Sequence, residues 1–180
     1  MKKTLITLIL FLTCSVGLFA KPSFLLVADI EAPVVVTEYG GDSSPQIHAF
    51  GIPMIGADFQ IPAASPLKMY AGFRTFPALI GVVLEADIKA GYAFEKPETW
   101  KNHHIELLGN FAAGAQLGFL DGFSALPVCD LGFQVFWMSE EKGWFWGLGP
   151  NLRMLLNYFN HDHFELNTDF SLKLSAGYKF

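Results

Sequence analysis

The C-terminal segment from Phe164 to Phe180 alternates between two classes of residue without a break. The first class is apolar or small and comprises Phe164, Leu166, Thr168, Phe170, Leu172, Leu174, Ala176, Tyr178 and Phe180. The residues between them are mostly polar: Glu165, Asn167, Asp169, Ser171, Lys173, Ser175, Gly177 and Lys179. A period of two predicts a β-strand. A strand in a soluble protein usually has about 5 to 6 residues, so this strand is unusually long. Its length is sufficient to cross a bilayer obliquely.

The N-terminus predicts export of the chain. Two lysines precede an uncharged apolar run that ends in small residues at Ala20, which is the layout of a secretory signal peptide over residues 1–20. Its removal leaves ten basic residues against seventeen acidic ones, a formal charge of about −7. This charge argues against nucleic acid as a partner. Cys129 would then be the single cysteine, so we expect no internal disulfide.

The composition is hydrophobic at 52%, yet no uncharged apolar run after residue 20 reaches the length of about 18 residues that a transmembrane helix needs. Only helices and closed barrels satisfy every backbone polar group within lipid. An exported, apolar chain without helical spans therefore predicts one barrel domain over residues 21–180.

Glycines, prolines and polar clusters divide this domain into segments that favour strands. The segments are 24–37, 46–61, 67–73, 79–94, 104–119, 128–138, 144–158 and 164–180, with turns predicted at 38–45 and 74–78 among others. The alternation is cleanest in 79–94 and 164–180 and poor in 24–37. The fold class that we predict is all-β: a single eight-stranded antiparallel transmembrane β-barrel after an N-terminal signal peptide.

The chain resembles the small eight-stranded bacterial outer-membrane β-barrel family, which includes the outer-membrane protein A membrane domain and its X and W relatives. Tyr178 and the terminal Phe180 carry the specific part of the resemblance, because they match the C-terminal strand signature that the barrel assembly machinery reads. The resemblance implies a location in the cell outer membrane, with outer-membrane lipid, the assembly machinery and periplasmic chaperones as partners. It also implies a monomer.

Aromatic residues fall near the predicted strand ends, as in the girdles of membrane barrels. If Phe180 marks the periplasmic side, that rim holds Phe24, Tyr92, Phe94, Trp137, Trp144 and Tyr178. The outer rim would hold Tyr39, Phe73, Phe119, Tyr158 and Phe164.

Charged residues occupy the face that an eight-stranded barrel would enclose, and such a barrel is just wide enough for its side chains to fill. The predicted lumenal charges are Lys68, Glu85, Asp87, Lys89, Arg153, Asp169 and Lys173, together with Asp58, Glu106, Asp130 and Glu165. Buried charges need partners, and both signs are present. We therefore predict a charge-paired polar plug rather than an ion path or a proton relay. A final hairpin that turns about His161 would place Arg153 opposite Asp169.

Histidines occur in two short clusters, His103-His104 and His161-Asp162-His163. No third ligand set accompanies either cluster, so we predict no metal, and we predict no cofactor. No inward histidine adjoins an inward serine and a carboxylate in the predicted wall, so we expect no catalytic residues and no enzyme.

The predicted function is that of an integral outer-membrane barrel protein with a polar lumen and a structural or narrow-channel, porin-like role. Two alternatives stay open. One is an outer-membrane lipid-modifying enzyme on a barrel scaffold. The other is a secreted lipocalin-like binding barrel, in which the apolar face would point inward to a ligand.

Overall fold

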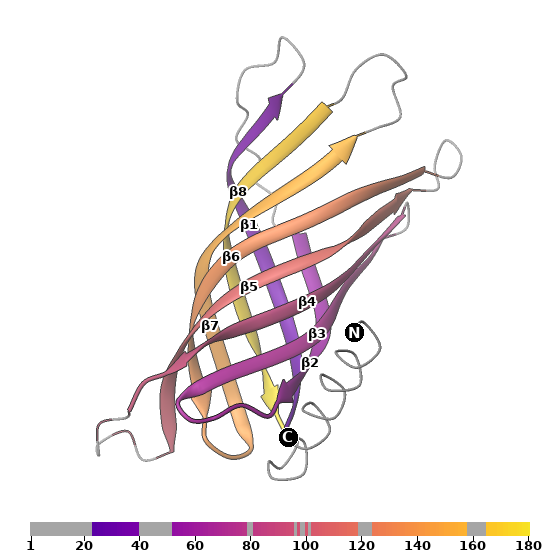
Figure 1. Ribbon diagram of the computed structural model, residues 1–180. Coiled ribbons are helices and arrows are strands. Elements are labelled where there is room, and N and C mark those ends of the chain that lie inside the picture. The colour runs from indigo at the N-terminus through magenta and orange to yellow at the C-terminus, as the bar shows by residue number, and fades with distance from the viewer. Residues whose placement is uncertain are drawn as a thin grey trace, which may run out of the picture.

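The computed structural model describes residues 23–39, 52–78, 81–95, 97, 100, 102–118, 124–157 and 165–180. These residues form eight antiparallel strands that close into one barrel in the order β1 to β8, as the chain runs (Figure 1). The strands are β1 (Phe24–Tyr39), β2 (Ile52–Ile61), β3 (Leu67–Ala78), β4 (Gly81–Ala93), β5 (His103–Gly118), β6 (Ser124–Ser139), β7 (Gly143–Asn157) and β8 (Glu165–Lys179). The predicted fold class is confirmed, while the predicted signal peptide lies outside the described residues.

The barrel closes where β1 pairs with β8, from Leu25 opposite Lys179 to Tyr39 opposite Leu166. Because the strand number is even, β1 begins and β8 ends at the same end of the barrel, which we call the terminal end (Figure 1). Beyond the last strand, the Phe180 N–H donates to the carbonyl of Phe24 at 2.9 Å.

The strands β1 and β3 are longer than predicted. Residues 74–78 were expected to form a turn, and so was the segment that begins at Glu38, but β3 runs to Ala78 and β1 to Tyr39. The reason is tertiary: in a closed sheet every backbone edge faces a neighbouring strand, and pairing with β4 carries β3 through Pro77.

The poor alternation of the first strand has a local cause. The register between β1 and β8 shifts between Pro33 and Val35, which is a bulge or irregularity of the ladder. An extra residue on one strand changes the face on which the following side chains lie. Before it, Leu25, Val27, Asp29 and Glu31 point inward as a regular series.

The barrel has its polar side chains inside and its apolar side chains outside. Along β4, Glu85, Asp87 and Lys89 are buried, whereas Leu84 and Ile88, which alternate with them, are about half exposed. This arrangement contradicts the lipocalin-like alternative, which needs an apolar interior and a polar exterior.

Aromatic rings gather at the terminal end. Phe24 contacts Phe59 and Phe180, with ring centroids 5.1 and 5.8 Å apart, and Tyr178 contacts Trp144 and Phe180 at 5.5 and 5.0 Å.

The predicted ring of aromatics at the opposite end is wrong for Phe73. Since β3 continues five residues past it, Phe73 lies in the middle of the wall, opposite Ala57 and Ala86. Phe119, Tyr158, Phe164 and the side chain of Tyr39 lie outside the described residues.

Candidate functional site: the barrel lumen

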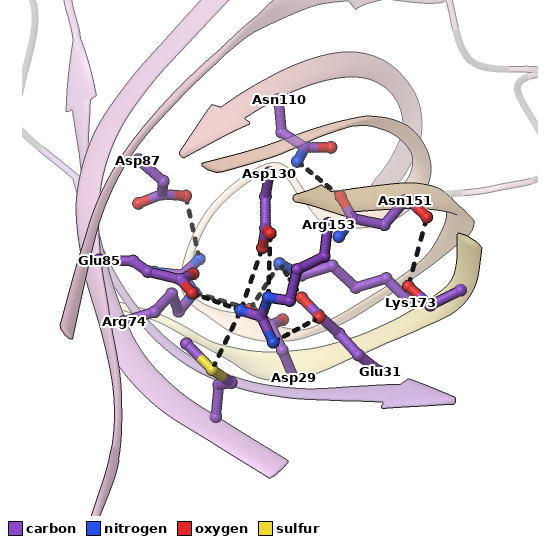
Figure 2. A network of polar contacts seen from close by, with 12 residues as sticks. Asp29, Glu31, Arg74, Glu85, Asp87, Asn110, Asp130, Asn151, Arg153 and Lys173 are labelled. Atoms are coloured by element: carbon purple, nitrogen blue, oxygen red, sulfur yellow. Dashed lines mark hydrogen bonds and ion pairs between the residues drawn. The ribbon is translucent and has the colours of Figure 1, made fainter. Parts of the chain in front are cut away.

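The lumen holds a network of ionisable side chains at mid-height, formed by the inward residues of seven strands. It comprises Asp29, Glu31, Asp58, Arg74, Glu85, Asp87, Lys89, Asp130, Arg153 and Lys173, which we call the lumen network. Figure 2 labels all of these residues except Asp58 and Lys89. Asp130 is fully buried and Arg74 is 1% exposed. The charges are therefore out of reach of bulk water, and each requires a partner within the barrel.

One half of the network surrounds Arg74 of β3. Its Nε donates to Asp29 Oδ2 at 2.7 Å, and its Nη1 and Nη2 donate to the two oxygens of Asp58 at 2.7 and 2.9 Å. Asp87 Oδ2 lies 3.6 Å from Nη2. Lys89 binds Asp58 Oδ2 at 2.9 Å and also contacts Asp87. The bidentate pair with Asp58 orients the guanidinium and strengthens the attraction.

The other half surrounds Arg153 of β7, near the centre of Figure 2. Its Nη1 lies 3.1 Å from Glu31 Oε2, and its Nε and Nη2 donate to Asp130 at 3.0 and 3.2 Å. Nη2 also contacts Glu85. One guanidinium therefore ties together carboxylates from β1, β4 and β6.

Lys173 of β8 joins the two halves. Its Nζ lies 3.0 Å from Glu31 Oε1 and 3.7 Å from Asp29 Oδ2, so it contacts one carboxylate from each half. The whole network contains six carboxylates and four cations. With every group ionised it would carry an excess of two negative charges.

The predicted lumenal charges lie at two levels. Glu85, Asp87, Lys89, Arg153 and Lys173 belong to the lumen network, as do Asp58 and Asp130. Lys68 and Glu106 lie nearer the terminal end. The side chain of Glu165 lies outside the described part of the chain.

Asp169 faces Arg153 in the register of β7 and β8, and this is the register that a turn about His161 predicts. The side chain of Arg153 contacts three carboxylates from β1, β4 and β6, which the argument from one hairpin could not include.

Sequence reasoning missed Asp29, Glu31 and Arg74. The first two lie on the strand whose alternation is broken further along by the register shift, and Arg74 lies in a segment that was predicted to turn. The sequence did contain a signal for these residues, because a period of two places them on the inward face. It runs backward from Glu31 to Asp29, and forward from Lys68 through Tyr70 to Arg74.

A layer of apolar side chains fills the lumen between this network and the terminal end. It consists of Leu25, Val27, Leu108, Phe136, Met138 and Phe145, with the ring of Tyr70, and we call it the apolar layer. All seven are at most 5% exposed. Gly147 makes room for it, because a Cβ there would lie 2.4 Å from the ring of Phe136. The sequence analysis did not predict this layer, although its members alternate with the outward residues of their strands.

A third group lies beyond the apolar layer, at the mouth of the terminal end. Glu106 is fully buried and accepts from the Tyr70 hydroxyl at 2.8 Å. Its other oxygen lies 2.7 Å from His104 Nε2 and 4.0 Å from Lys68 Nζ. The Lys179 ammonium donates to the carbonyls of Ser139 and Glu140 at 3.2 and 3.0 Å.

Among the described residues, no three potential metal ligands come together to form a metal site. The described chain also contains no helix with the length and apolar character needed to span a membrane.

We expect unequal losses of stability from removing a positive and a negative charge of the lumen network. Arg153→Ala should lower the free energy of unfolding in urea by about 3 to 5 kcal/mol, because three carboxylates lose their shared cation. Glu85→Gln keeps the shape and reduces the negative excess, so its loss should be far smaller. Lys142→Ala, at an exposed turn, serves as the control. Equal losses in the two lumen variants would show that charge balance does not govern this site.

Gly72 provides a second test, which concerns space. A Cβ at Gly72 would lie 2.1 Å from Asp58 Oδ1 and 2.6 Å from Asp87 Oδ1. Gly72→Ala should therefore displace the carboxylates from Arg74 and cost about 1 to 3 kcal/mol of unfolding free energy. Gly109→Ala is the matched control, because the nearest atom to its Cβ would be 3.6 Å away. Similar urea midpoints for both variants would contradict the packing described around Arg74.

No family model matches the chain, and no curated protein matches it in sequence. Solved structures match its fold. The Neisserial surface protein A has 13% identity and a TM-score of 0.52, with 88% of this chain and 95% of that one covered. The N-terminal β-barrel domain of Pseudomonas aeruginosa OprF has 9% identity and a TM-score of 0.46, with 88% of this chain and 97% of that one covered. Ail, the attachment invasion locus protein of Yersinia pestis, has 10% identity and a TM-score of 0.39, with 88% of this chain and 98% of that one covered. The likeness to the Neisserial surface protein A shows that this chain shares the barrel fold of that protein.

Proposed function

We propose that this protein is an integral outer-membrane β-barrel with a closed lumen and a structural role in the membrane. The observation that carries the proposal is the inverted polarity of the barrel. Ile88, Phe133 and Trp146 are 55 to 65% exposed on the outer wall, while ionisable groups fill the interior. Such an outer surface is unfavourable in water and favourable in lipid.

Two further features support the membrane location. Aromatic rings surround the terminal end of the wall, where membrane barrels carry an aromatic girdle at the interface. Tyr178, Lys179 and Phe180 also match the pattern that outer-membrane assembly reads in the family that the chain resembles. In this proposal the terminal end faces the periplasm.

The contents of the lumen favour a structural role over a channel. An ion entering at the terminal end would pass the polar side chains of the mouth and then meet the apolar layer, whose side chains offer no replacement for its hydration shell. It would then meet guanidinium and carboxylate groups that are already bound to one another. Apolar constrictions oppose conduction by excluding water. A narrow-channel role would require both layers to rearrange.

We expect the purified barrel to conduct poorly. In planar bilayers it should give no openings or only very small ones, because the charge network and the apolar layer both block the bore. Folding should be verified first, by the change in gel mobility on boiling and by retention in carbonate-washed membranes. Release by carbonate would reject the integral barrel, whereas large stable conductance from membrane-retained protein would reject the closed lumen alone.

Deletion of Phe180 should block assembly into the outer membrane. The chain would lose the terminal aromatic of the assembly signal, its ring contacts with Phe24 and Tyr178, and its hydrogen bond at the β1–β8 closure. Cell fractionation should find the shortened chain degraded or aggregated in the periplasm. Phe133→Ala removes an equally exposed outward ring far from the terminus and should assemble normally. Normal outer-membrane levels of the deletion variant would refute this role for Phe180.

A further inference from the structure

A polar pocket of about 450 Å³ opens at the terminal end of the lumen. Its wall includes Lys68 of β3, His104 of β5 and Lys179 of β8, so three basic side chains from separate strands face one space. The apolar layer lies beneath it and separates it from the lumen network. The pocket is therefore open at the terminal end and closed toward the lumen network, and its volume is within the range of sites for small molecules.

The two lysines have hydrogen-bonding capacity to spare. Within the part of the chain that the structure describes, the Lys179 ammonium donates to two backbone carbonyls, which leaves one of its three N–H groups. Lys68 has a single described partner, Glu106 Oε1 at the long distance of 4.0 Å, and its side chain is 25% exposed. Both ammonium groups can therefore approach a bound anion.

His104 is held in one orientation by a buried carboxylate. Its Nε2 lies 2.7 Å from Glu106 Oε1, and because a carboxylate only accepts, Nε2 carries the hydrogen. Its Nδ1 is buried without a hydrogen-bond partner among the described residues, and the side chain is only 10% exposed. Because Nδ1 is closed to a molecule the size of water, a ligand in the pocket would meet the rest of the His104 ring and not this nitrogen.

We propose that this mouth pocket binds the phosphate group of a small phosphate ester. A phosphate ester offers three free oxygens and up to two negative charges to Lys68 and Lys179, whereas a carboxylate offers two oxygens and one charge. It can therefore accept from both ammonium groups at once. The volume exceeds that of a bare phosphate ion, and Pro66, Ala93 and Phe94 line the space left for the carbon part.

Two acidic side chains set the expected strength of binding. Glu95 and Glu140 line the pocket as well, and both are exposed. Their repulsion makes binding weak and sensitive to salt. If the ligand were instead an amine, these two side chains would attract it. The effect of removing Glu95 therefore distinguishes an anionic ligand from a cationic one.

The test uses the full barrel refolded in a maltoside detergent, because phosphocholine detergents would compete for the site. Glycerol 3-phosphate is titrated by calorimetry, and the ring of His104 is followed by NMR. We expect saturable binding, about tenfold weaker in Lys68→Gln, since a hydrogen bond to a charged group is lost. Glu95→Gln should tighten it. Each variant must show the mobility change of a folded barrel on boiling.

Lys142→Gln is the matched control, because it removes the same charge from an exposed turn at the terminal end that does not line the pocket. Inorganic phosphate and acetate are titrated in parallel, and comparing inorganic phosphate with the ester shows whether free phosphate or an ester such as a lipid headgroup is the better ligand. The proposal is overturned if glycerol 3-phosphate does not saturate, if acetate binds as tightly, or if Lys142→Gln weakens binding as much as Lys68→Gln. Weaker binding in Glu95→Gln would also overturn it. These outcomes are independent of conductance and membrane retention.

Discussion

The closed hydrogen-bond ladder is the constraint on which the rest of this structure depends. Pairing of β1 with β8 removes both edges of the sheet, so every strand has a neighbour on each side. Once the sheet is closed, alternate side chains are committed to a narrow interior or to the outer wall. Strand segments with weak local preference, such as the end of β3 past Arg74, follow their neighbours into the ladder.

The polarity of the interior follows from this closure. With the apolar residues on the outer wall, the charged residues of the same strands must point inward. There they are out of reach of water and must neutralise one another. Arg74 and Arg153 suit this task, because each guanidinium binds several carboxylates at once and ties together strands that are distant around the barrel. Glycine at position 72 gives the carboxylates around Arg74 the space that a side chain would occupy.

The layering of the lumen separates two kinds of chemistry. The lumen network is charged and internally paired, which fits a role in holding the barrel together. The mouth beyond the apolar layer has lysine donors that are not fully used. A filled lumen is therefore compatible with a binding site at its end, because the apolar layer keeps a ligand in the mouth from reaching the paired charges.

The sequence by itself determined the architecture. The period of two in segments such as Phe164–Phe180 predicted long strands, and the eight segments predicted a barrel with an even number of strands. The predicted turn about His161 gave the register that places Arg153 opposite Asp169. These properties are local, because alternation and hairpin register depend on residues close together in the chain. Only the tertiary structure decided which charges meet. Asp29, Arg74 and Lys173 come from β1, β3 and β8, and closure of the barrel brings them together. The apolar layer and the mouth pocket likewise depend on the heights at which inward residues of different strands lie, and only the stagger of a closed sheet determines those heights.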